Sequence, residues 1–201
     1  MANKVGGVKS WDDLREAAKH GYSDAITVLA TIEVIERSNR PALMKAINDA
    51  EAGPAAVMLR DAAFQRVQLI VVRAFDPVRN ADDIHLRAAI DFLREPGRVD
   101  EEHWPDRRTD LRRAIELFDG AAIDPRLSAL KHMRNKEIAH WARYGCDKAR
   151  PLIHELFGFA QTTCLVWERL SFGAGTVMIE VDHQIDLYRD AAEAFWSRWE
   201  N

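Results

Sequence analysis

Apolar residues recur at intervals of three and four along nearly the whole chain, and this spacing places them on one face of an α-helix. Only the stretch from Thr176 to Val181, which is rich in β-branched residues, is predicted to be extended. The pattern predicts helices over nine ranges, namely 10–21, 23–35, 41–53, 54–76, 82–95, 106–118, 124–143, 150–173 and 182–200.

Capping residues, prolines and glycines set the predicted boundaries. Ser10 caps the first helix and Gly21 ends it, because glycine is a poor helix former. Pro54 opens the most regular helix, which stops at Asp76-Pro77 because the residue before a proline avoids the helical region. Asp82 or Asp83 caps the next helix, and Asp124-Pro125 opens the helix over 124–143.

This succession of helices, with at most one extended piece, predicts an all-α fold. Long helices joined by short turns are typical of a bundle with antiparallel neighbours. We therefore expect one domain over residues 1–201. Its parts are N-terminal helices in 1–53, a core in 54–175 and a C-terminal helix in 182–200.

Charge is unevenly distributed. The net charge is −4, yet the stretch from Arg126 to Arg150 carries seven Lys or Arg against two acidic residues. Such a local positive field on an acidic body attracts a polyanion to one place. Cys146 and Cys164 match no metal-binding spacing and are expected to be reduced thiols. The N-terminus lacks a signal-peptide pattern and no apolar run is long enough for a membrane, so we expect a cytoplasmic protein.

One motif stands out inside the basic stretch. Arg134 is followed by the polar residue Asn135 and, a few residues later, by His140. An arginine, a polar residue and a histidine in this order resemble the signature of the HEPN superfamily. The ending Ile138-Ala139-His140 is similar to the abortive-infection U-type branch, and so, more loosely, is the segment Val72–Asp76 with the helix after it.

The resemblance implies a bundle of four to five core helices with extra helices at both ends. HEPN proteins are often toxins or abortive-infection effectors, and many are ribonucleases that use no metal. It therefore implies a metal-independent endoribonuclease without a cofactor, in a toxin–antitoxin or phage-defence setting. The expected partners are RNA and an antitoxin protein.

The residue types suit cleavage of RNA by its own 2′-hydroxyl. His140 changes charge near neutral pH and can act as acid or base. Arg134 offers a permanently charged fork for phosphate oxygens, and Asn135 can orient a phosphate or the imidazole. Around these three candidate catalytic residues we expect an RNA-binding set made of Lys131, His132, Lys136 and Arg143.

Arg134 and His140 do not share a face of a straight helix. Six residues separate them by about 9 Å along the axis and roughly 120° around it. A two-fold axis that sets two such helices face to face lets both copies build one cleft. We therefore expect a homodimer with a shared site, as the family resemblance also implies.

Two other functions remain open. Glu137-Ile138-Ala139-His140 and Glu180-Val181-Asp182-His183 have the Glu-x-x-His spacing of metal-carboxylate bundles, for which Glu33 and Glu36 are further candidate ligands. The alternative is a non-catalytic domain that binds RNA or a protein. His85, His103 and His154 are interpreted as isolated structural or exposed residues. The final helix is predicted to carry Tyr188, Ala192, Phe195 and Trp199 on one face, and its tryptophans suggest packing or a dimer surface.

Overall fold

The computed structural model describes residues 7–80, 82–138 and 152–200, and within these ranges it is built of helices and contains no strand. This confirms the predicted all-α fold class. The α-helices are α1 (Trp11–Ser38), α2 (Pro41–Asp49), α3 (Gly53–Ala74), α4 (Leu86–Leu93), α5 (Pro105–Ala122), α6 (Pro125–Met133), α7 (Ile153–Gly173) and α8 (Val181–Ser197). Two short elements are the 3-10 helix η1 (Val99–Glu101) and the π-helical segment η2 (Arg134–Ile138).

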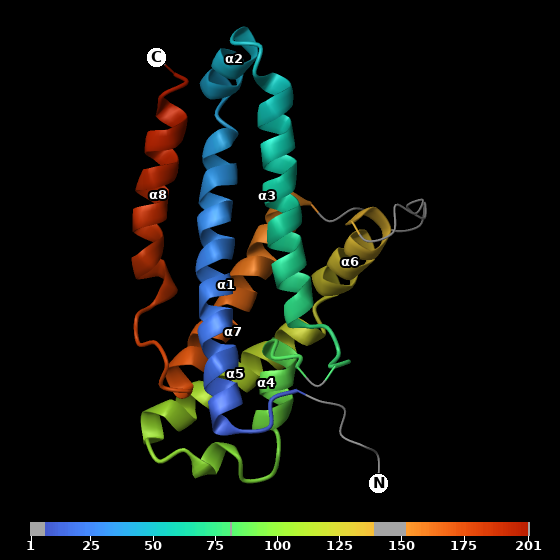
Figure 1. Cartoon of the computed structure of the whole chain (residues 1–201), viewed down its shortest axis with the longest axis vertical. Helices are drawn as coiled ribbons and strands as arrows, with labels where there is room; N and C mark the ends of the chain where they lie inside the picture. The colour runs from blue at the N-terminus through green and yellow to red at the C-terminus, as the bar shows by residue number, and fades with distance from the viewer. Residues whose placement is uncertain (1–6, 81, 139–151, 201) are drawn as a thin grey trace.

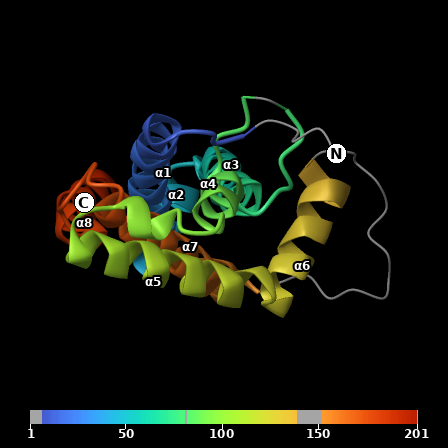
Figure 2. The ribbon, with the colours of Figure 1, turned by 90° about the horizontal axis from the view of Figure 1, so that it is seen from below.

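Three long helices, α8, α1 and α3, run side by side along the long axis of the molecule (Figure 1). The short helix α2 turns the chain between α1 and α3, and α7 passes behind α1. Seen from below, α5 lies across the bundle and α6 turns outward beside α3 (Figure 2). Helix α7 packs most extensively against α5 and α1, so it is the central helix of the lower half.

Aromatic rings join these layers. Phe75 at the end of α3, Phe118 of α5 and Phe159 of α7 are fully buried. The centroid of the Phe75 ring lies 5.0 Å from that of Phe118 and 5.4 Å from that of Phe159. Burying one such side chain contributes about 2 to 3 kcal/mol. A smaller cluster of Leu43, Ile47 and Trp196 attaches α2 to α8.

The break predicted at Gly21 is wrong, because α1 continues through it as one helix of 28 residues. A β-carbon on Gly21 would lie 1.9 Å from Cε3 of the Trp167 ring. The glycine therefore permits close approach of α1 and α7 and does not end a helix. The helix predicted over 106–118 also extends further, because α5 continues through Gly120 to Ala122. A β-carbon on Gly120 would meet nothing within 4 Å.

Two further expectations need correction. Asp83 does not cap α4, which begins at Leu86. Its carboxylate instead accepts hydrogen bonds from the backbone N–H groups of Arg79 and Asn80, at 2.6 and 2.9 Å, and so closes the loop between α3 and α4. The expected extended piece forms no strand. It is tied down by the Tyr22 hydroxyl, which donates to the Ile179 carbonyl oxygen at 2.8 Å.

The buried face of α8 also differs from the predicted one. Ile185, Ala192 and Trp196 face the bundle, whereas Phe195 and Trp199 are largely exposed. None of the described helices combines the length and the apolar character that crossing a bilayer demands.

The Gly21 contact generates a test of the fold. Gly21→Ala should lower the free energy of unfolding by about 1 to 3 kcal/mol, because the new methyl group must displace the Trp167 ring. Gly120→Ala is the matched control, since its methyl group meets open space and should stabilise α5 by about 0.5 to 1 kcal/mol. Urea unfolding measures both changes. A Gly21→Ala protein as stable as the wild type would contradict the proposed close approach of the two helices.

Candidate functional site

The motif begins where α6 changes its helical winding. Asp124 opens α6 by accepting a hydrogen bond from the Arg126 backbone N–H at 2.8 Å, as the sequence predicts. After Met133 the backbone widens into the π-helical segment η2. Such segments are rare and are frequent at functional sites. The angle of roughly 120° expected between Arg134 and His140 applies to a straight α-helix. The described part of the motif, Arg134–Ile138, is π-helical, so this angle does not apply to it.

The C-terminal end of α3 supports the site. The Phe75 carbonyl oxygen accepts hydrogen bonds from Arg87 Nε of α4 at 3.1 Å and from Lys131 Nζ of α6 at 3.0 Å. Burial lowers the pKa of the Lys131 ammonium, an effect that Asp76 opposes. Lys131, an expected RNA-binding residue, thus uses one of its three donors to attach α6 to α3.

Arg134 is held in place by two acceptors. Its Nη1 donates to Asp76 Oδ2 at 2.5 Å, and its Nε donates to Asn135 Oδ1 at 3.1 Å. The side chains of Arg134 and Asp76 are 18% and 27% exposed, so the pair is partly shielded from water. A guanidinium carries five N–H donors. Among the described residues, Asp76 and Asn135 occupy two of these donors.

Two hollows meet at the Arg134–Asp76 pair. The larger, of about 540 Å³, is lined by Arg73, Asp76, Pro77, Arg79, Asn80, Asp83, His85, Arg134 and Asn135. The smaller, of about 380 Å³, is lined by Arg66, Leu69, Ile70, Arg73, Asp76 and Arg134. Four arginines therefore face two aspartates around this pair, which gives the region a positive balance that suits an anion.

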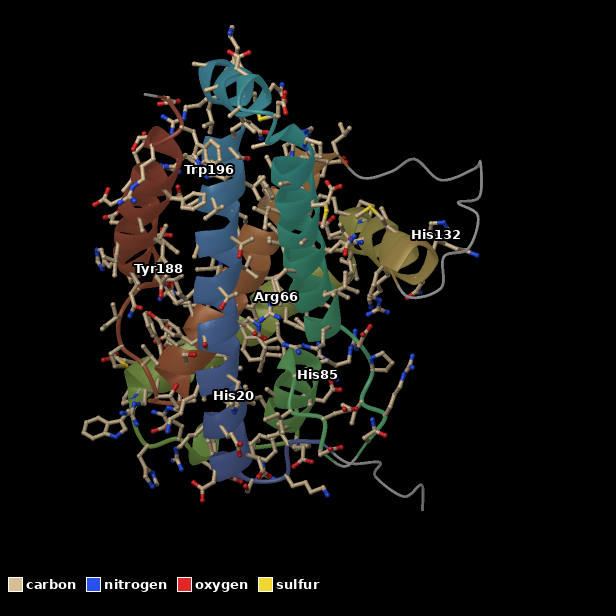
Figure 3. All side chains as sticks on the ribbon, turned by 45° about the horizontal axis from the view of Figure 1, so that its top comes forward. His20, Arg66, His85, His132, Tyr188 and Trp196 are labelled. Atoms are coloured by element: carbon tan, nitrogen blue, oxygen red, sulfur yellow. The ribbon has the colours of Figure 1, made fainter. Side chains whose placement is uncertain are left out.

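The arginines besides Arg134 come from α3 and the loop after it. Arg66, Arg73 and Arg79 are exposed, and Arg66 projects from the middle of α3 (Figure 3). Arg73 Nη2 donates to Asp24 Oδ2 of α1 at 2.6 Å. These arginines were not predicted as site residues, because they lie outside the basic stretch of the motif and only folding brings them beside it.

His85 is the unexpected member of the site. It is the residue that precedes α4, it is half-buried, and it lines the same hollow as Arg134 and Asn135. Burial lowers the pKa of its imidazole, while the neighbouring Asp83 and Asp76 act in the opposite direction. His85 was predicted to be an isolated structural or exposed residue, because its neighbours in the sequence form no catalytic motif.

The structure brings only some of the predicted site residues together. Arg134 and Asn135 share the larger hollow, and Lys136 is a half-buried residue of η2. His132 lies on α6, well apart from His85 at the start of α4 (Figure 3). His140 and Arg143 lie outside the described residues, so their predicted roles stay predictions.

Metal ligands are not gathered anywhere in the ranges that the structure describes, where no group of three or more His, Cys, Asp or Glu residues is close enough to hold an ion. Glu180 and His183 lie at the start of α8, with Glu180 Oε2 and His183 Nδ1 3.9 Å apart. Glu33, nominated with them, is instead paired with Arg37 and Arg189. His140 lies outside the described residues.

An all-α bundle with Arg134-Asn135 at the end of α6 is the arrangement that the HEPN resemblance implied. The family model described as AbiU2, a HEPN-type family, matches residues 9–195. No curated protein matches the chain, and no solved structure does. The chain therefore belongs to the AbiU2 family, the abortive-infection U-type branch of the HEPN proteins.

The Arg134–Asp76 pair generates a test of how the site is held together. Asp76→Ala should free the Arg134 side chain, so the guanidinium N–H signals of Arg134 in NMR spectra should broaden through faster exchange with water. The free energy of unfolding should fall by about 1 kcal/mol, because the pair is only partly shielded. Asp82→Ala, an exposed aspartate of the same loop, is the control and should change neither quantity. Unchanged Arg134 signals in Asp76→Ala would exclude the positioning role.

Proposed function

We propose that the protein is a metal-independent endoribonuclease in which Arg134 binds the phosphate to be cleaved. The observation that carries this proposal is the placement of Arg134. Its guanidinium is anchored by Asp76 and Asn135, lines a hollow with a positive balance of charge, and belongs to the motif that resembles the HEPN signature. Membership of the AbiU2 family supports an RNA substrate.

The proposed reaction is an attack of the 2′-oxygen of a ribose on the adjacent phosphorus. The 2′-hydroxyl loses its proton to a base, a bond forms between the 2′-oxygen and phosphorus, and the bond to the 5′-oxygen breaks. The leaving 5′-oxygen takes up a proton from an acid. The products end in a 2′,3′-cyclic phosphate and a 5′-hydroxyl, and no metal or cofactor enters the balance.

Each proposed residue has one task. Arg134 stabilises the extra negative charge that develops on the phosphate oxygens, which is a large term in a partly shielded site. Asn135 keeps the guanidinium oriented through its bond to Nε. His140 acts as acid or base. Lys131, His132, Lys136 and Arg143 extend the contact with the RNA backbone, and Arg66, Arg73 and Arg79 add a second group of cations on α3 and its loop.

The cellular setting that we propose is defence against phage by abortive infection, or a toxin–antitoxin pair in which a partner protein restrains the nuclease. Both rest on family membership. The competing function is that of a non-catalytic domain whose hollow binds RNA or protein without cutting. Only a measurement of turnover distinguishes this domain from a nuclease.

The nuclease proposal is tested with oligoribonucleotides in excess EDTA. The wild-type protein should cut them and leave 2′,3′-cyclic phosphate or 3′-phosphate ends, and a 2′-deoxy substitution at the cut site should abolish cleavage. Arg134→Ala and His140→Ala should each reduce the rate by about 10² to 10⁴, because each removes a group that acts in the transition state. The matched control is His103→Ala, because His103 is an exposed histidine between η1 and α5.

Each alternative function has its own result in this assay. Binding of the same RNA without cleavage by the wild-type protein would favour the non-catalytic domain. Cleavage that stops in EDTA and returns with a divalent metal would favour the metal-carboxylate bundle. Cleavage that persists at the wild-type rate in both motif variants would show that another site cuts the RNA.

We further propose that the active form is a homodimer whose two copies build one cleft. Mixing Arg134→Ala with His140→Ala protein should then restore roughly a quarter of the wild-type activity, because a mixed dimer keeps one site with both residues intact. Light scattering gives the mass of the particle in the same samples. A monomeric mass, or a mixture no more active than its two components, would contradict the shared site.

A further inference from the structure

The proposed reaction needs two proton transfers, one from the 2′-hydroxyl and one to the 5′-oxygen. The family motif of this chain contains a single imidazole, His140. Arginine stays protonated at neutral pH and therefore cannot act as the proton acceptor. A second proton-transfer group must therefore come from elsewhere in the site or from a second copy of the chain.

His85 is a side chain of the right type in the right place. It lines the hollow of about 540 Å³ that also contains Arg134 and Asn135, and a hollow of this size accepts a phosphodiester with its neighbouring ribose. His85 also lines the adjacent hollow of about 390 Å³ between α1 and the α3–α4 loop, so its ring stands at the boundary of the two. Figure 3 shows it at the start of α4, near His20 of α1.

The two ring nitrogens of His85 have different surroundings. Nδ1 is enclosed and has no hydrogen-bond partner among the described residues. A buried polar atom without a partner is an exception in folded proteins and calls for a functional reason. Nε2 is not among these enclosed unpartnered atoms, and the His85 side chain lines the hollow that contains Arg134.

Charged groups of both signs surround the ring. The electrostatic neighbours that act on it are Asp83 of the loop, Asp76 and Arg73 at the end of α3, and Arg87 of α4. The other titratable or charged groups that line the two hollows are Arg79, Arg134, His20, Asp24 and Asp82. Burial is the largest influence on the pKa of His85 and lowers it, which favours the neutral form of the ring.

We propose that His85 is the general base of the reaction, which accepts the proton of the attacking 2′-hydroxyl at Nε2. His140 is then left to donate the proton to the 5′-oxygen. After one turnover His85 carries a proton and His140 lacks one, and exchange with water restores both. This inference rests on the proposed nuclease function and deepens it.

Replacement of His85 removes no capping hydrogen bond from α4. The residue precedes α4, yet its side chain makes no capping hydrogen bond to the helix. His20 offers a matched control, because it is a histidine of the adjacent hollow that is exposed and lies 3.7 Å from Glu16. A defect specific to His85 therefore reports on chemistry in the hollow of Arg134.

The experiment compares His85→Gln, His20→Gln and the wild-type protein on one oligoribonucleotide in EDTA. His85→Gln should lower kcat by about 10² to 10⁴ with little change in KM, whereas His20→Gln should keep the wild-type kcat. The wild-type rate should fall as pH drops below the pKa of the base, because a protonated base accepts nothing. The wild-type rate should level off above that pKa, whereas the residual rate of His85→Gln should rise in proportion to hydroxide concentration without levelling off.

Two further measurements separate a base from a structural residue. Added imidazole should restore part of the activity of His85→Ala, because it fits the space that the ring leaves. A substrate with sulfur in place of the 5′-oxygen needs no acid, so it should rescue His140→Ala and leave His85→Gln slow. Absence of imidazole rescue together with a wild-type pH profile in His85→Gln overturns the inference.

Failure of the inference is distinct from failure of the function beneath it. A wild-type protein that cuts RNA at the same rate as His85→Gln overturns the role of His85 and leaves the nuclease intact, with a second copy's His140 as the remaining source of the proton acceptor. A wild-type protein that cuts no RNA overturns both.

Discussion

The site depends on one residue at the end of α3. The ring of Phe75 is buried between Phe118 and Phe159, which fixes where the backbone of α3 stops. Its carbonyl oxygen, freed by the end of the helix, accepts hydrogen bonds from Arg87 and Lys131 and so attaches α4 and α6 to the same point. The next residue, Asp76, binds Arg134. Burial of the Phe75 ring thus helps to set the position of the Arg134 guanidinium.

The acidic balance of the whole chain is compatible with the proposed polyanionic substrate because the charges are separated in space. The arginines that line the two hollows come from α3, its following loop and η2, while Asp76 both neutralises part of this charge and orients Arg134. An anchored guanidinium loses little further freedom when it binds a phosphate. The Arg134–Asp76 ion pair therefore reduces the positive charge of the site but holds the Arg134 guanidinium in a defined orientation.

Local signals predicted most helix boundaries and failed where tertiary contacts set them. Asp124 caps α6 and Pro54 opens α3 as the sequence indicated, because capping and proline effects act within a few residues. Gly21 was misread as a helix end, since its role is to admit a tryptophan from α7 that is remote in sequence. The switch of η2 to π-helical winding also escaped prediction, because no residue type specifies it.

The sequence by itself determined the helical class, the family, and the pair Arg134-Asn135, because periodicity and a short motif are local properties of the chain. Only the tertiary structure decided which other side chains share the hollow with that pair. Asp76 and His85 reach it because α3 ends there and Asp83 folds the following loop over it. Contacts between residues far apart in the chain follow from packing, which no local pattern encodes.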